Sequence, residues 1–255
     1  MVKRLINRSI YDLSALRGPC VRCTKEINIS APYFRLMIDL HTHTIFSDGE
    51  LLPSEQCRRA KVIGYEAIAL TDHADYTNLE TLIAAARMAG YLEESYGLTV
   101  LPGVELTHVP PAHIAAMARK AKQLGAEVVV VHGETPVEPV APGTNVAAAA
   151  CKDVDILAHP GFITPEVART ARKNGIFLEI TARCGHNMTN GYVARVARDE
   201  GVLLVVDSDA HGPDDLISGE RARAVALGAG LNDAEAKAAT RNARNFVRKV
   251  ANRRR

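Results

Sequence analysis

The sequence has no tryptophan, and aromatic residues make up only 5% of its 255 residues. Few aromatic side chains leave few platforms on which single-stranded bases could stack, which counts against a dedicated single-strand binding protein. No apolar run approaches the roughly 18 residues that a membrane-spanning helix needs. Lys3 and Arg4 are not followed by the apolar block of a signal peptide. The sequence therefore predicts neither a membrane protein nor a secreted one.

Cysteine is also scarce. Five cysteines, an odd number in a long chain, do not suggest a disulfide framework, and this favours a reducing, cytoplasmic location. Cys20 and Cys23 form a lone Cys-x-x-Cys pair. Without a second pair of Cys or His nearby, these two residues are not expected to complete a structural zinc site.

The net charge of +2 hides an uneven distribution. Residues 1–36 carry seven basic and two acidic side chains, and residues 241–255 carry seven basic side chains and no acidic one. The segment between them, 37–240, therefore has a net charge of −10. An acidic body disfavours a long polyanion, so nucleic acid is a possible but less favoured partner.

Short apolar segments that do not alternate with polar residues recur along the chain, as expected for parallel strands covered on both faces. They are Leu36–Leu40, Ala67–Thr71, Leu98–Leu101, Glu127–Val131, Val154–Ala158, Ile176–Ile180 and Val202–Val206. Helical segments lie between them, opened by residues such as Pro53, Asn78 or Pro111 and ended by glycines. A final helix over 234–251 is predicted, with Asp233 as its N-cap. The pattern predicts a seven-stranded parallel β/α fold.

Polar residues that can bind metals or protons follow almost every predicted strand. These are His41 and His43, Asp72 and His73, Glu105, His132, His159, Glu179, Asp209 and His211. Only closure into a (β/α) barrel brings all the C-terminal strand ends around one mouth, where barrel enzymes place their active sites. Residues 1–36 do not show this alternation of strand and helix segments and are predicted to be an N-terminal extension. Residues 37–255 are predicted to form a single barrel domain with a C-terminal helix.

So many imidazoles and carboxylates in one place would repel one another and lose hydration unless cations neutralised them. One tetrahedral zinc takes about four ligands, so the set suits two or three divalent ions. The predicted ligands are His41, His43, Asp48, His73, Glu105, His132, His159, Asp209 and His211.

The order of these motifs resembles that of the PHP (polymerase and histidinol phosphatase) superfamily. The motifs are His41-Thr42-His43, Ser47-Asp48-Gly49, Thr71-Asp72-His73, Gly103-Val104-Glu105, His132-Gly133, Ala158-His159-Pro160 and Asp209-Ala210-His211. The resemblance covers residues 37 to about 228 and implies a distorted (β/α)7 TIM-like barrel. It also implies a trinuclear centre of zinc, manganese or iron at the C-terminal ends of the strands.

Carried over by motif, the resemblance assigns each ligand to an ion. The first ion would be held by His41, His43, Glu105 and Asp209. The second would be held by Glu105, His132 and His159, and the third by Asp48, His73 and His211. Some relatives have His where this chain has Asp48, and the carboxylate favours oxygen-loving ions such as manganese at the third site.

Two neighbouring ions can share a hydroxide that attacks phosphorus at neutral pH, while the third binds phosphate oxygens. Glu105 and Asp209 would be the catalytic ligands. Arg183 is a candidate second phosphate clamp, and His186 is a candidate proton donor to the leaving group. Asp72 and Glu134 are expected to orient ligand histidines. His108 and His113 are read as ordinary loop and helix residues.

The favoured function is hydrolysis of small phosphate monoesters, as in histidinol phosphatases, with no prediction of oligomeric state. The alternative within the superfamily is a nucleotide or single-strand nucleic-acid phosphoesterase or exonuclease. An amidohydrolase or TatD-like barrel also begins with His-x-His, but it does not need the third site of Asp48, His73 and His211. A non-catalytic relative would have lost ligands, and none is missing.

Overall fold

The computed structural model describes residues 37–254. The predicted extension 1–36, with Cys20 and Cys23, lies outside the described residues, so the proposed domain boundary stays a prediction. Within the described residues, no helix is both long and apolar enough to cross a membrane.

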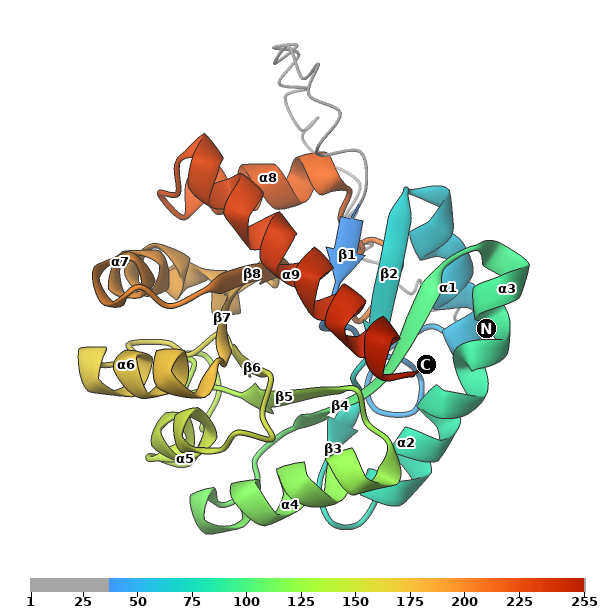
Figure 1. Cartoon of the computed structure of the whole chain (residues 1–255), viewed down its shortest axis with the longest axis horizontal. Helices are drawn as coiled ribbons and strands as arrows, with labels where there is room; N and C mark the ends of the chain where they lie inside the picture. Colours follow the sequence, from blue (N-terminus) through green and yellow to red (C-terminus); the bar gives the residue numbers. More distant parts are fainter. Residues whose placement is uncertain (1–36, 255) are drawn as a thin grey trace, which may run out of the picture. The chain divides into compact units, whose positions relative to one another are not determined.

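Seven parallel strands form one continuous path, confirming the predicted fold class (Figure 1). They are β1 (Met37–Asp39), β2 (Tyr65–Leu70), β4 (Thr99–Leu106), β5 (Val128–His132), β6 (Ile156–Ala158), β7 (Phe177–Thr181) and β8 (Leu204–Asp207). Each strand pairs with the next along the chain, apart from β3 (His73–Ala74), a two-residue strand that pairs with β4. The sequence did not predict β3, which places His73 directly opposite Glu105.

The first and last strands meet just beyond their C-terminal ends. Thr42 and Ala210 form a parallel bridge, and the His43 amide donates to the Ala210 carbonyl at 2.8 Å. The Asp209 amide donates to the His41 carbonyl at 3.0 Å. These bonds close the barrel on the side where the predicted ligands lie.

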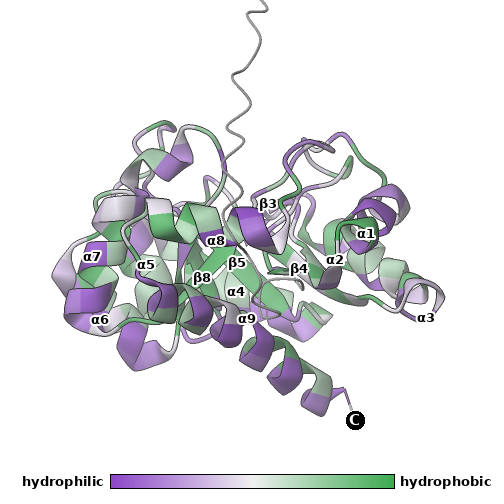
Figure 2. Cartoon of the chain, turned by 90° about the horizontal axis from the view of Figure 1, so that it is seen from above, coloured by the Kyte–Doolittle hydropathy of each residue, from purple (hydrophilic) through white to green (hydrophobic). Residues whose placement is uncertain are grey.

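Alternate strand residues serve two different cores, because successive side chains point to opposite faces of a sheet. On β5, Val129 and Val131 pack in the cluster that includes the surrounding helices, whereas Val128 and Val130 belong to a second cluster inside the barrel. The hydrophobic strands and the polar outer surfaces of the helices are distinguished by colour in Figure 2. This double burial explains the unbroken apolar runs in the sequence.

The helices surround the barrel. They are α1 (Pro53–Val62), α2 (Leu79–Met88), α3 (Leu92–Tyr96), α4 (Pro111–Leu124), α5 (Thr144–Ala150), α6 (Pro165–Asn174), α7 (Asn190–Glu200), α8 (Gly219–Gly228) and α9 (Asp233–Arg253). The helix expected from Asn78 to Gly97 is divided by a 3₁₀ turn, η3 (Ala89–Tyr91). A helix was expected after each strand, but the bounds of α5 were not predicted. The N-cap of α9 is Asn232 rather than Asp233, because Asn232 accepts from the Glu235 amide in a capping box.

Helix α9 crosses the end of the barrel where the strands begin (Figure 1). Ala243 and Val250 belong to the cluster inside the barrel, and Phe246 packs against it. At the end of the helix, Arg254 makes ion pairs with Glu93, at 2.8 Å, and with Glu127. The apolar side of α9 thus covers this end of the barrel, and the ion pairs fasten its last turn.

Candidate metal centre

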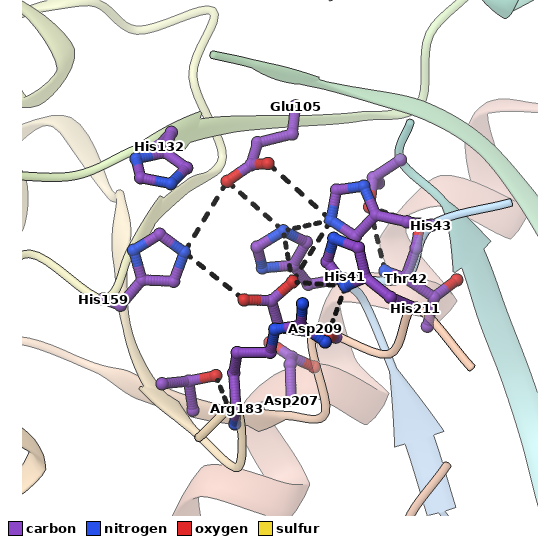
Figure 3. A network of polar contacts seen from close by, with 12 residues as sticks. His41, Thr42, His43, Glu105, His132, His159, Arg183, Asp207, Asp209 and His211 are labelled. Atoms are coloured by element: carbon purple, nitrogen blue, oxygen red, sulfur yellow. Dashed lines mark hydrogen bonds and ion pairs between the residues drawn. The ribbon is translucent and has the colours of Figure 1, made fainter. Parts of the chain in front are cut away.

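The structure brings all nine predicted ligands to the C-terminal ends of the strands. Figure 3 shows His41, His43, Glu105, His132, His159, Asp209 and His211. Six of them are buried: His41, His43, Glu105, His132, His159 and Asp209. The other three, Asp48, His73 and His211, lie closer to solvent. The set therefore has a closed inner part and a more open outer part.

The inner part is centred on two carboxylates. His41 Nε2 lies 3.3 Å from Glu105 Oε1, and His43 Nε2 lies 3.2 Å from Asp209 Oδ1. On the other side, His159 Nε2 lies 3.7 Å from Glu105 Oε1 and 3.5 Å from Asp209 Oδ2. Glu105 and Asp209 therefore lie between the His41–His43 pair and His159, as Figure 3 shows.

The outer part is centred on Asp48. Its Oδ1 lies 3.2 Å from His211 Nε2 and 3.4 Å from His73 Nε2. Ligand atoms of Asp48, His73 and His211, together with one from His43, all lie within 4.8 Å of one another. This cluster contains the residues predicted for the third ion.

Several imidazoles are held by Nδ1, which leaves Nε2 directed into the site. Glu179 accepts from His41 Nδ1 at 2.8 Å, the Gly133 carbonyl accepts from His132 Nδ1 at 3.1 Å, and the Asp209 carbonyl accepts from His211 Nδ1 at 3.0 Å. Fixing one ring nitrogen in this way selects the tautomer and orients the other nitrogen for a metal.

The prediction that Asp72 and Glu134 orient ligand histidines is wrong. Asp72 accepts from the Thr44 amide and hydroxyl, and Glu134 accepts from the amides of Gly143 and Asn145. Both carboxylates stabilise loops. The orienting role falls to Glu179 on β7, which also accepts from the His159 amide at 3.0 Å.

The electrostatics of the site suit a cation. Burial lowers the pKa of His43 to about 4, so its imidazole is neutral at neutral pH. Burial alone would lower the pKa of His73, but the carboxylates of Glu105 and Asp48 raise it to about 10. Burial would raise the pKa of Asp209, yet His41 and His43 hold it below its usual range. The carboxylates are thus ionised, and in the protein alone a proton on His73 offsets part of their charge.

Three buried polar atoms of the predicted ligands have no hydrogen-bond partner among the described residues. They are His43 Nδ1, Glu105 Oε1 and His159 Nδ1. Leaving such atoms unpaired is costly, and each one in a native protein asks for an explanation. Glu105 Oε1, which faces the Nε2 atoms of His41 and His159, is the atom that a bound cation would satisfy most directly. The residues present therefore fit a metal centre.

Backbone strain gathers at the same place. In the described part of the chain, the non-glycine residues with positive φ are His108 (52°), His159 (26°) and Asp209 (53°). Strained conformations of this kind concentrate at functional sites. Gly133, next to the predicted ligand His132, is also constrained, since a Cβ there would lie 2.2 Å from the Ala158 carbonyl oxygen.

Sequence reasoning missed two residues of the site. Glu138 Oε2 lies 3.0 Å from His132 Nε2 and 3.5 Å from His108 Nε2, and the hydrogen bond from His132 lowers the pKa of Glu138 to about 2. The ring of His108 lies 5.7 Å from that of His132. Both residues come from loops after strand ends, and only the spacing of His108, two residues beyond the end of β4, could have drawn attention to it.

The two candidate residues of the loop after β7 differ in position. Arg183 is partly exposed and its guanidinium lies 3.2 Å from Asp215 Oδ2, the oxygen that accepts from the His211 and Gly212 amides. Figure 3 shows Arg183 beside Asp209. His186 is buried, and its ring lies 4.3 Å from the ring of His159.

Residues 39–218 match the PHP domain family. Since the match covers most of the chain, the protein belongs to this family. The predicted class, a metal-dependent hydrolase of phosphoester bonds, is confirmed at that level of detail.

Among its relatives, the chain is 54% identical over 202 residues to an uncharacterized protein of Methanocaldococcus jannaschii, covering 78% of this chain and 93% of that one. It is 32% identical to a protein of Caldanaerobacter subterraneus named probable phosphatase, covering 69% and 77% of the two chains.

The fold has close counterparts among solved structures. A chain of an archaeal ribonuclease P with mature tRNA superposes with a TM-score of 0.64 at 16% identity, covering 83% of this chain and 90% of that one. The histidinol phosphate phosphatase of Lactococcus lactis, complexed with zinc, L-histidinol and phosphate, gives 0.56 at 16% identity, covering 78% and 95%. At this identity both show the fold only.

Proposed function

We propose that the protein hydrolyses phosphate monoesters of small molecules, as a histidinol-phosphatase-like member of its family, using three divalent ions. One observation carries the proposal: each of the nine ligand positions is filled and all nine side chains converge at one mouth. The zinc-bound L. lactis enzyme, of the same fold, acts on histidinol phosphate and supports this class of substrate.

The proposed ligands are shared among three ions. His41, His43, Glu105 and Asp209 would hold the first, Glu105, His132 and His159 the second, and Asp48, His73 and His211 the third. Zinc, manganese or iron in such a centre supplies an activated water as the nucleophile and neutralises phosphate charge.

The chain's own residues would do the rest. Glu179 holds the His41 ring through Nδ1, and Glu105 keeps two ligand groups at a fixed separation. The Arg183 guanidinium uses Nη1 on Asp215, and its remaining donors would bind phosphate oxygens as the second clamp.

The second candidate, a nuclease or nucleotide phosphoesterase, draws on the basic surface of α9. Arg241, Arg248, Lys249 and Arg253 are exposed there. However, α9 covers the opposite end of the barrel, so a polyanion bound along it would lie away from the ligand cluster (Figure 1). This separation favours the small substrate.

The test compares a small phosphomonoester with a single-stranded oligonucleotide at low and moderate salt, with zinc, manganese or iron supplied. We expect turnover of the monoester with little salt dependence, because few phosphates are contacted. Arg248→Glu with Lys249→Glu should leave this turnover unchanged. Preference for the oligonucleotide, lost in that double variant, would establish the nuclease instead.

A further inference from the structure

His186 lies within a trio of buried imidazoles. Ligand atoms of His132, His159 and His186 all lie within 4.8 Å of one another, and the three residues are buried. The His186 ring centroid is 4.3 Å from that of His159 and 5.6 Å from that of His132. Only the first two residues of the trio belong to the nine-ligand set.

The His186 ring is oriented in the manner of the predicted ligands. Its Nδ1 hydrogen-bonds to the buried hydroxyl of Thr135 at 3.0 Å, which leaves Nε2 as the free nitrogen. His41 and His132 show the same division, with Nδ1 on Glu179 and on the Gly133 carbonyl. A hydrogen bond to one ring nitrogen is the usual means of fixing a metal-binding imidazole.

A carboxylate joins the free nitrogens. Glu138 Oε2 lies 3.0 Å from His132 Nε2, and Glu138 Oε1 lies 3.5 Å from His186 Nε2. Both imidazoles therefore direct Nε2 toward the same anion. With Nδ1 protonated on both rings, the two Nε2 lone pairs face a carboxylate, and a proton or a cation between them would satisfy all three groups.

We propose that His186 is a further protein ligand of the second ion, acting through Nε2 alongside Glu105, His132 and His159. The proposal rests on the metal centre of the proposed function and replaces the proton-donor role with a ligand role. The imidazoles of His132, His159 and His186 and the carboxylate of Glu105 form a nitrogen-rich ligand set, which suits zinc better than manganese. The second site would thus select zinc, in contrast to the third site with its Asp48 carboxylate.

The first test uses the unaltered protein without any substrate. Nitrogen-15 NMR of the metal-free full chain, with assigned imidazole resonances, follows the titration with Zn²⁺. We expect the Nε2 resonance of His186 to shift with those of His132 and His159. An unchanged His186 Nε2 at full zinc occupancy would overturn the proposal, and this result does not depend on how any variant folds.

The second test measures zinc affinity by competition with a chelator. His186→Gln should weaken one bound ion at least ~10²-fold, and Thr135→Val should weaken the same ion ~10- to 100-fold, the range found when a partner that orients a ligand is removed. The matched control is His113→Gln, since His113 is exposed on α4 and packs against Tyr76. The control should bind zinc normally.

The competing role has a different signature. If His186→Gln keeps full zinc affinity but loses turnover and the basic limb of the pH–rate profile, His186 is the proton donor and the ligand role is refuted. Normal affinity with normal turnover would refute both roles. Because zinc binding is measured without substrate, failure of the phosphatase assay leaves this test unaffected.

Discussion

The two ends of the barrel differ in the side chains that they bury: the mouth buries polar and charged groups, and the other end buries apolar ones. At the mouth, buried carboxylates and imidazoles face one another, polar atoms such as Glu105 Oε1 have no hydrogen-bond partner among the described residues, and His159 and Asp209 have strained backbone. At the other end, α9 covers the barrel with apolar side chains, and Arg254 is paired with Glu93 and Glu127.

The α9 end therefore contributes mainly to the stability of the fold, and the mouth contributes the groups that can carry out chemistry. At the mouth, strained backbone and desolvated polar groups lower the stability of the fold while they hold the candidate ligand atoms in place. At the α9 end, apolar burial and ion pairs raise the stability of the fold. Substitutions at the mouth should therefore change activity and metal content, whereas those at the α9 end should change stability alone.

The largest effect should follow removal of an inner ligand. His41→Ala or Asp209→Ala should abolish hydrolysis and lower metal content together. The metal-free variants should also unfold at a lower temperature, because Glu179 loses its buried partner in the first and the facing imidazoles lose theirs in the second. Elemental analysis, a phosphatase assay and thermal unfolding check this. Full activity in a metal-free preparation would contradict the metal centre itself.

A milder change at the mouth is Glu105→Gln. It keeps the shape but removes the charge that lies between His41 and His159, so we expect at least a ~10²-fold loss of kcat, the scale seen when a key electrostatic group is lost. Steady-state kinetics at saturating metal measure it. Near-normal turnover would place the shared carboxylate elsewhere.

The matching change at the other end is Val250→Ala. Two buried methyl groups of α9 are lost from the cluster inside the barrel, which should destabilise the fold by roughly 2 kcal/mol. Denaturant unfolding measures this loss. The folded fraction should keep its kcat, and a fall in kcat comparable with that of Glu105→Gln would erase the distinction between the ends.

The smallest effect concerns pH. Because the pKa of His73 is raised to about 10 in the protein alone, this imidazole is protonated at neutral pH and must release its proton on binding a metal. Affinity at the third site should therefore rise up to about tenfold per pH unit below 10, and calorimetry in buffers of different ionisation enthalpy should detect the released proton. Asp48→Asn should reduce this dependence by lowering the pKa of His73.

The strands, and the convergence of the nine candidate side chains at one mouth, were predictable because both follow from simple geometry. Buried parallel strands leave unbroken apolar runs, and closure of a barrel brings every strand end to one mouth. The roles of Asp72 and Glu134 were not predictable, since chain proximity does not reveal which atoms a carboxylate faces. Glu138 was missed for the same reason. Its contact with His132 depends on the path of the loop after β5.

The seam between β1 and β8 links the metal centre to the order in which the chain is made. Two of its bonds use the backbone of His41, His43 and Asp209, and the Leu40 amide donates to Asp207 across 167 residues of chain. A ribosome must therefore deliver residues up to Asp209 before the inner ligand group can exist. A chain arrested earlier could not assemble the proposed first site, so ion uptake there would report that synthesis had passed the last strand and that the barrel had closed.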